Sequence, residues 1–127
     1  MLFRSSETIL LVEDEEAVGE LAQEVLQGQG YTVLSARHGA DALLTAERHA
    51  RPIQLLLTDV VMPGMSGIEL AERLTTLRPG IRVLFTSGYA GDRVGRAGPG
   101  GVPPEILQKP FTSETLARRV RQVLDTG

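Results

Sequence analysis

The chain has 127 residues, of which 42% are hydrophobic, a formal net charge of −3 and no cysteine. This length suits one domain with its own hydrophobic core, and the absence of cysteine excludes disulfides and thiolate chemistry. The charge excludes a broadly basic surface for direct nucleic-acid binding, and no apolar run is long enough to cross a membrane. Because the first residues also lack the apolar segment of a signal peptide, we expect one cytoplasmic domain over residues 1–127, with its core at about 7–125.

The first half of the chain alternates between strand and helix patterns. Residues 8–12 form an apolar run typical of a buried strand, and from residue 15 the apolar side chains recur at helical spacing until the glycines at 28 and 30. Residues 31–36 alternate like a second strand nearer an edge, and residues 40–47 have the spacing of a second helix. The order so far is strand, helix, strand, helix.

The second half continues this alternation, with a strand at 53–58, a loop at 62–67, a helix at 68–77, a strand at 82–86, a short strand at 106–108 and a helix from 112. Residues 91–104, between the last two strands, are rich in glycine and proline, so any fourth helix there should be short or poorly ordered. Five strands that alternate with helices predict an α/β fold with a parallel sheet covered on both faces.

Four of the apolar runs end on a residue that can contact a phosphate or a metal ion, namely Asp14, Asp59, Ser87 and Lys109. In a parallel sheet these ends meet at the carboxyl edge, where open α/β sheets bind ligands. Lys109 is the one lysine among 13 basic residues. Its compact ammonium suits contact with a single anionic oxygen better than the planar guanidinium of arginine does.

Three carboxylates, those of Glu13, Asp14 and Asp59, are expected to crowd one pocket, which is unfavourable without a cation. Mg²⁺ is the cation that this oxygen-rich set favours. Asp59 could then attack phosphorus to give an acyl phosphate, with Mg²⁺ and Lys109 stabilising the charge and the Ser87 hydroxyl donating to a phosphoryl oxygen. Taken alone, the Ser87 hydroxyl is better explained by a hydrogen bond to the local backbone.

In this arrangement the chain resembles the receiver domain of two-component response regulators over nearly its whole length. The resemblance rests on Glu13-Asp14 after the first strand, Asp59 after the third, Ser87 before Gly88, and Lys109-Pro110-Phe111 after the fifth. It implies a flavodoxin-like sheet of order 2-1-3-4-5, and a Mg²⁺ shell completed by the main-chain carbonyl of Val61. It also implies that a histidine kinase or a histidine phosphotransfer protein supplies the phosphoryl group, and that the acyl phosphate later hydrolyses.

The same resemblance implies a conformational switch. Its residues would be Ser87, Tyr89 in the following loop, and the fifth-strand position that is aromatic in the family and is Ile106 here. Because Ile106 has no ring to turn inward, we expect the response to concentrate between residues 88 and 104. The segments 85–89 and 106–112 further resemble those of receivers in hybrid sensor histidine kinases.

Two other interpretations remain open at this point. A receiver-like domain could bind proteins without being phosphorylated, although it would then not need this complete set of polar strand ends. A small aspartyl-phosphate phosphatase would also use an aspartate, a lysine and Mg²⁺, but the haloacid dehalogenase type places a second aspartate two residues after the nucleophile, where this chain has Val61. His38 and His49 are not spaced as a metal pair and are predicted to lie on the surface.

Overall fold

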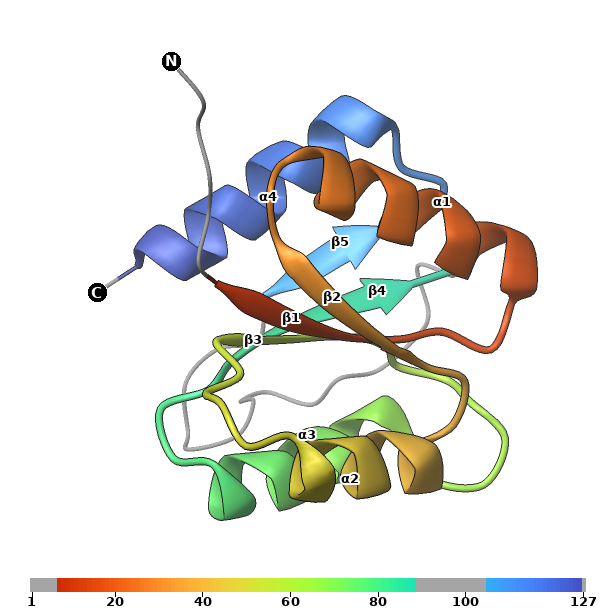
Figure 1. Ribbon diagram of the computed structural model, residues 1–127. Helices are drawn as coiled ribbons and strands as arrows, with labels where there is room; N and C mark the ends of the chain where they lie inside the picture. Colours follow the sequence, from red (N-terminus) through yellow and green to blue (C-terminus); the bar gives the residue numbers. More distant parts are fainter. Residues whose placement is uncertain (1–6, 89–104, 127) are drawn as a thin grey trace.

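The computed structural model describes residues 7–88 and 105–126, and this part of the chain contains a five-stranded parallel sheet with helices on both faces (Figure 1). The strand order is β2-β1-β3-β4-β5, which confirms the predicted fold. The elements in chain order are β1 (Thr8–Val12), α1 (Glu16–Gly28), β2 (Thr32–Ala36), α2 (Gly39–Arg48), β3 (Leu55–Asp59), α3 (Gly67–Leu77), β4 (Arg82–Ser87), β5 (Ile106–Gln108) and α4 (Ser113–Asp125). Residues 91–104, where a short fourth helix was expected, and Tyr89 lie outside the described residues.

The central strands are buried along their whole length, which explains their continuous apolar sequences. Every residue of β1 and of β3 is buried, and the two strands pair in parallel with Leu10 opposite Leu56. A parallel strand that is covered on both faces has no solvent side, so apolar residues occupy successive positions. The edge strand β2 shows exposed and buried positions instead, in keeping with its alternating sequence.

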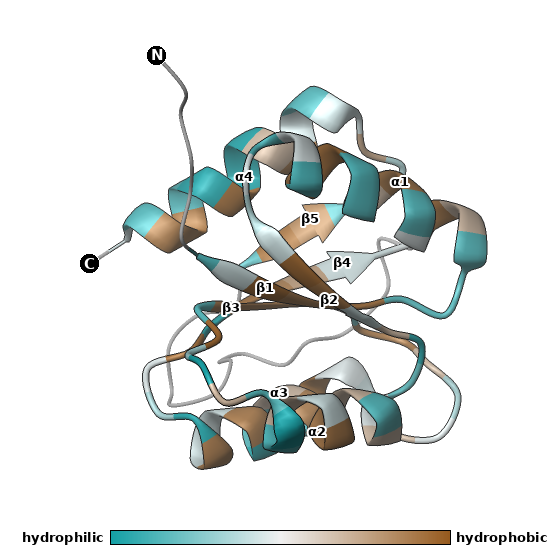
Figure 2. Cartoon of the chain, in the orientation of Figure 1, coloured by the Kyte–Doolittle hydropathy of each residue, from teal (hydrophilic) through white to brown (hydrophobic). Residues whose placement is uncertain are grey.

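The sheet divides the core into two layers. Helices α1 and α4 cover one face and α2 and α3 cover the other, with their apolar sides turned toward the strands (Figures 1 and 2). Leu26 and Leu116 are fully buried on the first face, and Leu70 and Leu74 on the second. Burial of each such side chain stabilises the fold by about 2 kcal/mol relative to exposure, so the helices are held mainly by this packing.

The helices lie where their spacing predicts, but in two of them a leucine lies outside the core. In α2 the buried residues are small, namely Gly39, Ala42 and Ala46, while Leu44 is 45% exposed. In α1, Leu21 is 41% exposed although it belongs to the predicted apolar stripe. Close packing against the sheet favours the small side chains in α2, and Leu21 borders a pocket described below.

The third strand begins later than predicted and includes the aspartate that was expected to follow it. It spans Leu55–Asp59 instead of residues 53–58, so Asp59 is its last residue. Ser66 then caps α3, because its hydroxyl accepts a hydrogen bond from the Glu69 amide at 3.2 Å. In the described part of the chain, no helix combines the length and the apolar character that crossing a membrane requires.

Candidate functional site

The three predicted carboxylates come together at the carboxyl edge of the sheet. Glu13 and Asp14 follow β1, Asp59 ends the neighbouring strand β3, and one oxygen of each carboxylate lies within 4.8 Å of the others. Glu13 is 6% exposed and Asp59 is 7% exposed, whereas Asp14 is partly exposed. Hard oxygen ligands in this spacing suit a divalent cation such as Mg²⁺, so these residues fit the predicted metal site.

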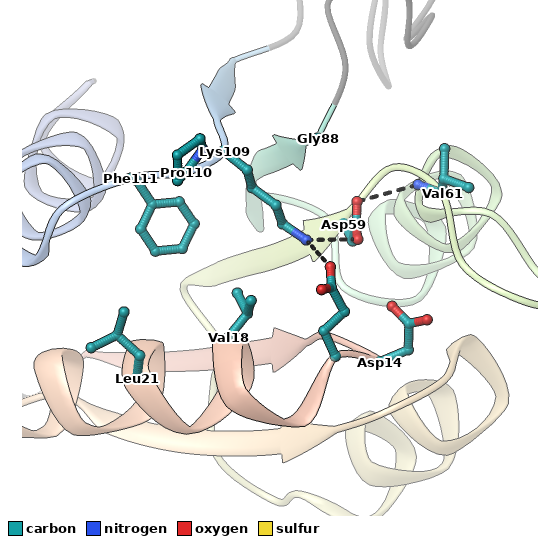
Figure 3. Close-up of a pocket in the computed structure, with 10 residues that line it drawn as sticks. Asp14, Val18, Leu21, Asp59, Val61, Gly88, Lys109, Pro110 and Phe111 are labelled. Atoms are coloured by element: carbon teal, nitrogen blue, oxygen red, sulfur yellow. Dashed lines mark hydrogen bonds and ion pairs between the residues drawn. The ribbon is translucent and has the colours of Figure 1, made fainter.

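Lys109 reaches the same cluster from the end of the edge strand β5. It follows β5, and its Nζ lies 2.9 Å from Glu13 Oε1 and 3.0 Å from Asp59 Oδ2. Its backbone N–H donates to the Ser87 carbonyl at 2.8 Å, which ties the end of β5 to the end of β4. Figure 3 shows the side chain extending from this anchor toward Asp59. The lysine is therefore directed at the acidic cluster.

Besides Glu13 and Asp59, the Lys109 ammonium contacts the carboxylate of Glu15, which the sequence pattern does not place in the site. Glu15 Oε1 lies 3.2 Å from Lys109 Nζ, and the Glu15 side chain is 63% exposed. Consecutive acidic residues at a helix start are ordinarily explained by the helix dipole, so the local pattern carried no signal for this contact. The backbone N–H of Glu15 also donates to Glu13 Oε2 at 3.0 Å, which orients the buried carboxylate.

The pKa values of Glu13 and Lys109 are both raised in the folded protein. Burial raises the pKa of Glu13, and the hydrogen bonds from Lys109 and from the Glu15 amide offset this only in part. Burial also works against the charge of Lys109, but its hydrogen bonds with Glu13 and Asp59 and their negative charges raise its pKa well above the ordinary value. Lys109 is thus a fixed cation at neutral pH, and the cluster still carries excess negative charge.

The loop after Asp59 holds the carboxylate in place. The Val61 amide donates to Asp59 Oδ1 at 3.4 Å, and the Gly67 amide donates to the Val60 carbonyl at 2.8 Å. A Cβ on Gly67 would lie 2.0 Å from the Asp59 carbonyl oxygen, so only glycine permits this approach. Val61, whose carbonyl is the predicted fourth metal ligand, is 61% exposed and borders the site.

Two of the predicted switch residues, Ser87 and Ile106, lie in the described part of the chain, and neither belongs to the acidic cluster. Ser87 is the last residue of β4, is 4% exposed and lies beside the Lys109 backbone through the bond described above. Ile106 is 38% exposed, and its carbonyl accepts a hydrogen bond from Arg119 of α4 at 3.1 Å, away from the acidic cluster. His38 is exposed, as predicted, whereas His49 is only partly exposed, and its Nε2 is buried without a hydrogen-bond partner among the described residues.

An open pocket of about 620 Å³ lies over these groups (Figure 3). Its polar part contains Asp14, Glu15, Asp59 and Lys109, and its apolar part contains Val18, Leu21, Val61, Pro110 and Phe111, with Gly88 between them. Figure 3 shows Val18 and Leu21 on α1 opposite Phe111. The sequence pattern does not indicate this apolar wall, because Val18 and Leu21 fall in the apolar stripe that is expected to face the core.

Comparison with known proteins places this architecture in a family. The model of the response regulator receiver domain matches residues 9–121. The chain is 40% identical over 120 residues to the sensor kinase CckA of Brucella abortus, with 94% of this chain aligned to 13% of that protein. It is 34% identical over 116 residues to the response regulator receiver protein CpdR of the same organism, with 91% of this chain aligned to 95% of that protein.

Solved structures agree with the sequence matches. The receiver domain of the hybrid histidine kinase CckA superposes with a TM-score of 0.78 at 41% identity, covering 93% of this chain and 99% of that one. A CheY-like receiver domain protein of Methanospirillum hungatei JF-1 superposes with a TM-score of 0.81 at 29% identity, covering 95% of each chain.

A parallel sheet of order 2-1-3-4-5, with an acidic cluster and a lysine at its carboxyl edge, defines a receiver-type α/β domain. The chain belongs to the response regulator receiver domain family. It is accordingly a phosphoacceptor signalling domain of two-component systems. The chain spans about half the length of some curated relatives that it matches, such as the transcriptional regulatory protein YbdJ of Bacillus subtilis, of which it covers 50%.

The ion pairs of Lys109 make its neutral replacement destabilising. We expect Lys109→Met to lower the free energy of unfolding by about 2 kcal/mol near neutral pH without divalent cations, because it leaves buried carboxylates unpaired. The deficit should shrink as the pH falls, because the loss of Lys109 removes interactions that lower the pKa of Glu13, so the folded variant takes up a proton at a higher pH than the folded parent does. Denaturant unfolding at several pH values measures both effects.

Arg73→Met is the matched control for this experiment. Arg73 pairs with Glu69 at 3.0 Å on the surface of α3, where the two side chains are 55% and 49% exposed. An exposed pair of this kind contributes less than about 1 kcal/mol, so its loss should leave stability almost unchanged at every pH. Equal effects of the two substitutions would contradict the structural role assigned to the buried ion pairs.

Proposed function

We propose that Asp59 is the phosphoacceptor of this domain, and that Lys109, Ser87 and a Mg²⁺ ion held by Glu13, Asp14, Asp59 and the Val61 carbonyl assist the transfer. The observation that carries this proposal is that Asp59 belongs to the acidic cluster, contacts the Lys109 ammonium and lines an open pocket. A carboxylate in this setting is accessible to a donor, and the groups around it can stabilise charge on a phosphoryl group.

The proposed transfer uses a carboxylate oxygen of Asp59 as the nucleophile. It forms a bond to phosphorus as the phosphorus–nitrogen bond of a phosphohistidine breaks, and the histidine nitrogen keeps the electron pair of that bond. Mg²⁺, when bound, would neutralise charge on the transferring phosphoryl oxygens. Lys109 would stabilise another of these oxygens with its fixed positive charge, and the Ser87 hydroxyl would donate to a third. Attack of water on the acyl phosphate would later release inorganic phosphate and restore Asp59.

The chemistry of these residues fits a Mg²⁺ ion. Glu13, Asp14 and Asp59 bring three carboxylates within 4.8 Å of one another, and the Lys109 ammonium pairs with Glu13 and Asp59 alone among them, so negative charge remains in excess. This excess is relieved by a hard cation that takes one or two carboxylates directly and keeps water on its other positions. Burial is the largest cause of the raised pKa of Glu13, and the negative charge of Asp59 adds to it.

The proposed partner is a protein that carries a phosphorylated histidine, either a histidine kinase or a histidine phosphotransfer protein. The apolar wall of Val18, Leu21, Pro110 and Phe111 borders the acceptor pocket, and it offers a surface on which an apolar helix of that partner can dock. Such donors are charged from ATP, so we place the reaction in the cytoplasm. We further propose that residues 1–127 form one domain of a relay and that this domain passes the phosphoryl group onward to a histidine phosphotransfer protein. The similarity to the receiver domain of a hybrid histidine kinase supports this proposal.

The direct test is phosphorylation by a small donor. The protein is incubated with acetyl phosphate and Mg²⁺, and intact mass spectrometry follows transfer of the phosphoryl group with release of acetate. We expect a labile adduct that requires Mg²⁺, disappears when the metal is chelated before loading, and maps to Asp59 after borohydride reduction of the acyl phosphate. A protein that accepts no phosphoryl group from acetyl phosphate or from a phosphohistidine donor would instead be a binding-only receiver, and the proposal would fail.

A further inference from the structure

The Lys109 ammonium has three N–H donors and three carboxylate partners. Two of them, Glu13 and Asp59, are buried, with side chains 4% and 9% exposed. The third, Glu15, lies 3.2 Å away and is 63% exposed. The three donors of the ammonium are therefore all engaged before any phosphoryl group arrives.

A phosphoryl group on Asp59 needs one of these donors. Glu15 is the partner that can release it most easily, because an exposed ion pair is screened by water and contributes little to stability. Glu13 cannot move away as readily, since its carboxylate is buried and also accepts a hydrogen bond from the Glu15 amide at 3.0 Å. The contact between Glu15 and Lys109 thus belongs to the unphosphorylated state.

Glu15 also lines the pocket through which a donor must reach Asp59. Its carboxylate places a negative charge at the solvent side of the site, next to Asp14. Every phosphodonor carries negative charge, but not to the same degree. Acetyl phosphate is a dianion near neutral pH, whereas the protonated nitrogen of phosphoramidate, or of a phosphohistidine ring, cancels part of the charge of its phosphoryl group.

We propose that Glu15 is a specificity-determining residue, which disfavours small, highly charged phosphodonors by repelling them and by occupying the third donor of Lys109. This inference rests on the proposed phosphoacceptor function and deepens it. A protein partner escapes the discrimination, because its phosphorylated histidine carries less net charge and the apolar wall of the same pocket supplies further binding surface.

The size of the effect follows from Coulomb's law. A unit charge and a dianion about 7 Å apart in a water-like medium repel enough to change a rate about sevenfold. We therefore expect Glu15→Gln to raise the second-order rate constant for loading by acetyl phosphate about sevenfold, and that for phosphoramidate, which carries one net negative charge, about threefold. Salt at about 1 M should reduce both effects, since the screening length is then about 3 Å.

The experiment compares four proteins in the presence of Mg²⁺: the parent, Glu15→Gln, Glu15→Asp and Glu16→Gln. Gln keeps an oxygen that can accept from Lys109 but removes the charge, and Asp keeps the charge. Glu16 is the matched control, because it is the next residue, is exposed, and lines a different pocket with no contact to Lys109. We expect Glu16→Gln to load at nearly the parent rate. Glu15→Asp should load at a rate between those of the parent and Glu15→Gln, because it keeps the charge but its shorter side chain reaches less far toward Lys109.

The single lysine of the chain provides a second readout that does not depend on phosphorylation. Protein labelled with ¹³C-lysine has one ε-methylene NMR signal, and Glu15→Gln should shift it while Glu16→Gln should not. Equal loading rates for Glu15→Gln and Glu16→Gln, with a parent that does load, would overturn this inference alone. If neither the small donors nor a phosphohistidine donor phosphorylates the parent, the proposed function fails and this inference fails with it.

Discussion

Asp59→Asn is expected to abolish the labile phosphoryl adduct while the protein stays folded. An amide oxygen is a poor nucleophile toward phosphorus, so acyl phosphate formation at this position should fall below detection. The substituted side chain keeps one oxygen that can accept from Lys109 and loses the bond from the Val61 amide. It also removes one of three crowded charges, so we expect the free energy of unfolding to change by no more than about 1 kcal/mol.

The measurements are intact mass after incubation with acetyl phosphate and Mg²⁺, and thermal unfolding of the same samples. Asp41→Asn is the matched control, because Asp41 is exposed in the first turn of α2 and makes the same change of charge away from the site. The control should load like the parent. A labile adduct on Asp59→Asn at the parent rate would place the acceptor on another residue, and Asp14 would be the first to examine.

Gly67→Ala is expected to cause the largest loss of stability. A Cβ at this buried position would lie 2.0 Å from the Asp59 carbonyl oxygen and 2.9 Å from the Asp59 carbonyl carbon. Both are backbone atoms at the end of β3, so they cannot move aside as a flexible side chain would. We expect a loss of about 3 kcal/mol or more in the free energy of unfolding, because the start of α3 must separate from β3.

The same displacement should reach the functional site. The Gly67 amide donates to the Val60 carbonyl at 2.8 Å, and the intervening loop carries the Val61 amide that contacts Asp59. Whatever fraction of Gly67→Ala remains folded should therefore accept a phosphoryl group more slowly than the parent. Denaturant unfolding and loading by acetyl phosphate, carried out on the same preparation, measure the two effects.

Gly28→Ala separates this steric effect from the general effect of replacing glycine. Gly28 is the last residue of α1, and a Cβ there has no heavy atom within 4 Å. Alanine should leave stability unchanged or raise it by about 0.5 kcal/mol, since it restricts the unfolded chain. A Gly67→Ala protein as stable as Gly28→Ala would show that the β3–α3 junction tolerates a methyl group, contrary to this geometry.

The sequence predicted the strands, the parallel sheet and the residues at its carboxyl edge because each signal is local. A buried parallel strand is a short apolar run, and the polar residue at its end is adjacent in sequence, as Asp59 is to β3. The crowding of Glu13, Asp14 and Asp59 then follows from the strand order that the resemblance to receiver domains implies, and the structure brings one oxygen of each within 4.8 Å of the others.

Other features depend on how the elements pack, and the local pattern does not encode that packing. Glu15 and Lys109 are 94 residues apart, and they meet because α1 and the residues after β5 flank the same pocket. Leu21 faces Phe111 across this pocket instead of entering the core, and α2 buries Ala42 and Ala46 while Leu44 is left exposed. Helical spacing defines an apolar stripe, but the angle at which the helix docks on the sheet decides which part of it is buried.

The amino-acid sequence therefore predicts the alternating strands and helices and the polar residues at the strand ends from local signals, and the resemblance to receiver domains adds the strand order that gathers these residues. The contact between Glu15 and Lys109, the apolar wall of the pocket and the close approach of Gly67 to Asp59 become visible in the folded structure. Each of these is a contact between segments separated in the chain, and its distance depends on the packing of whole elements against one another.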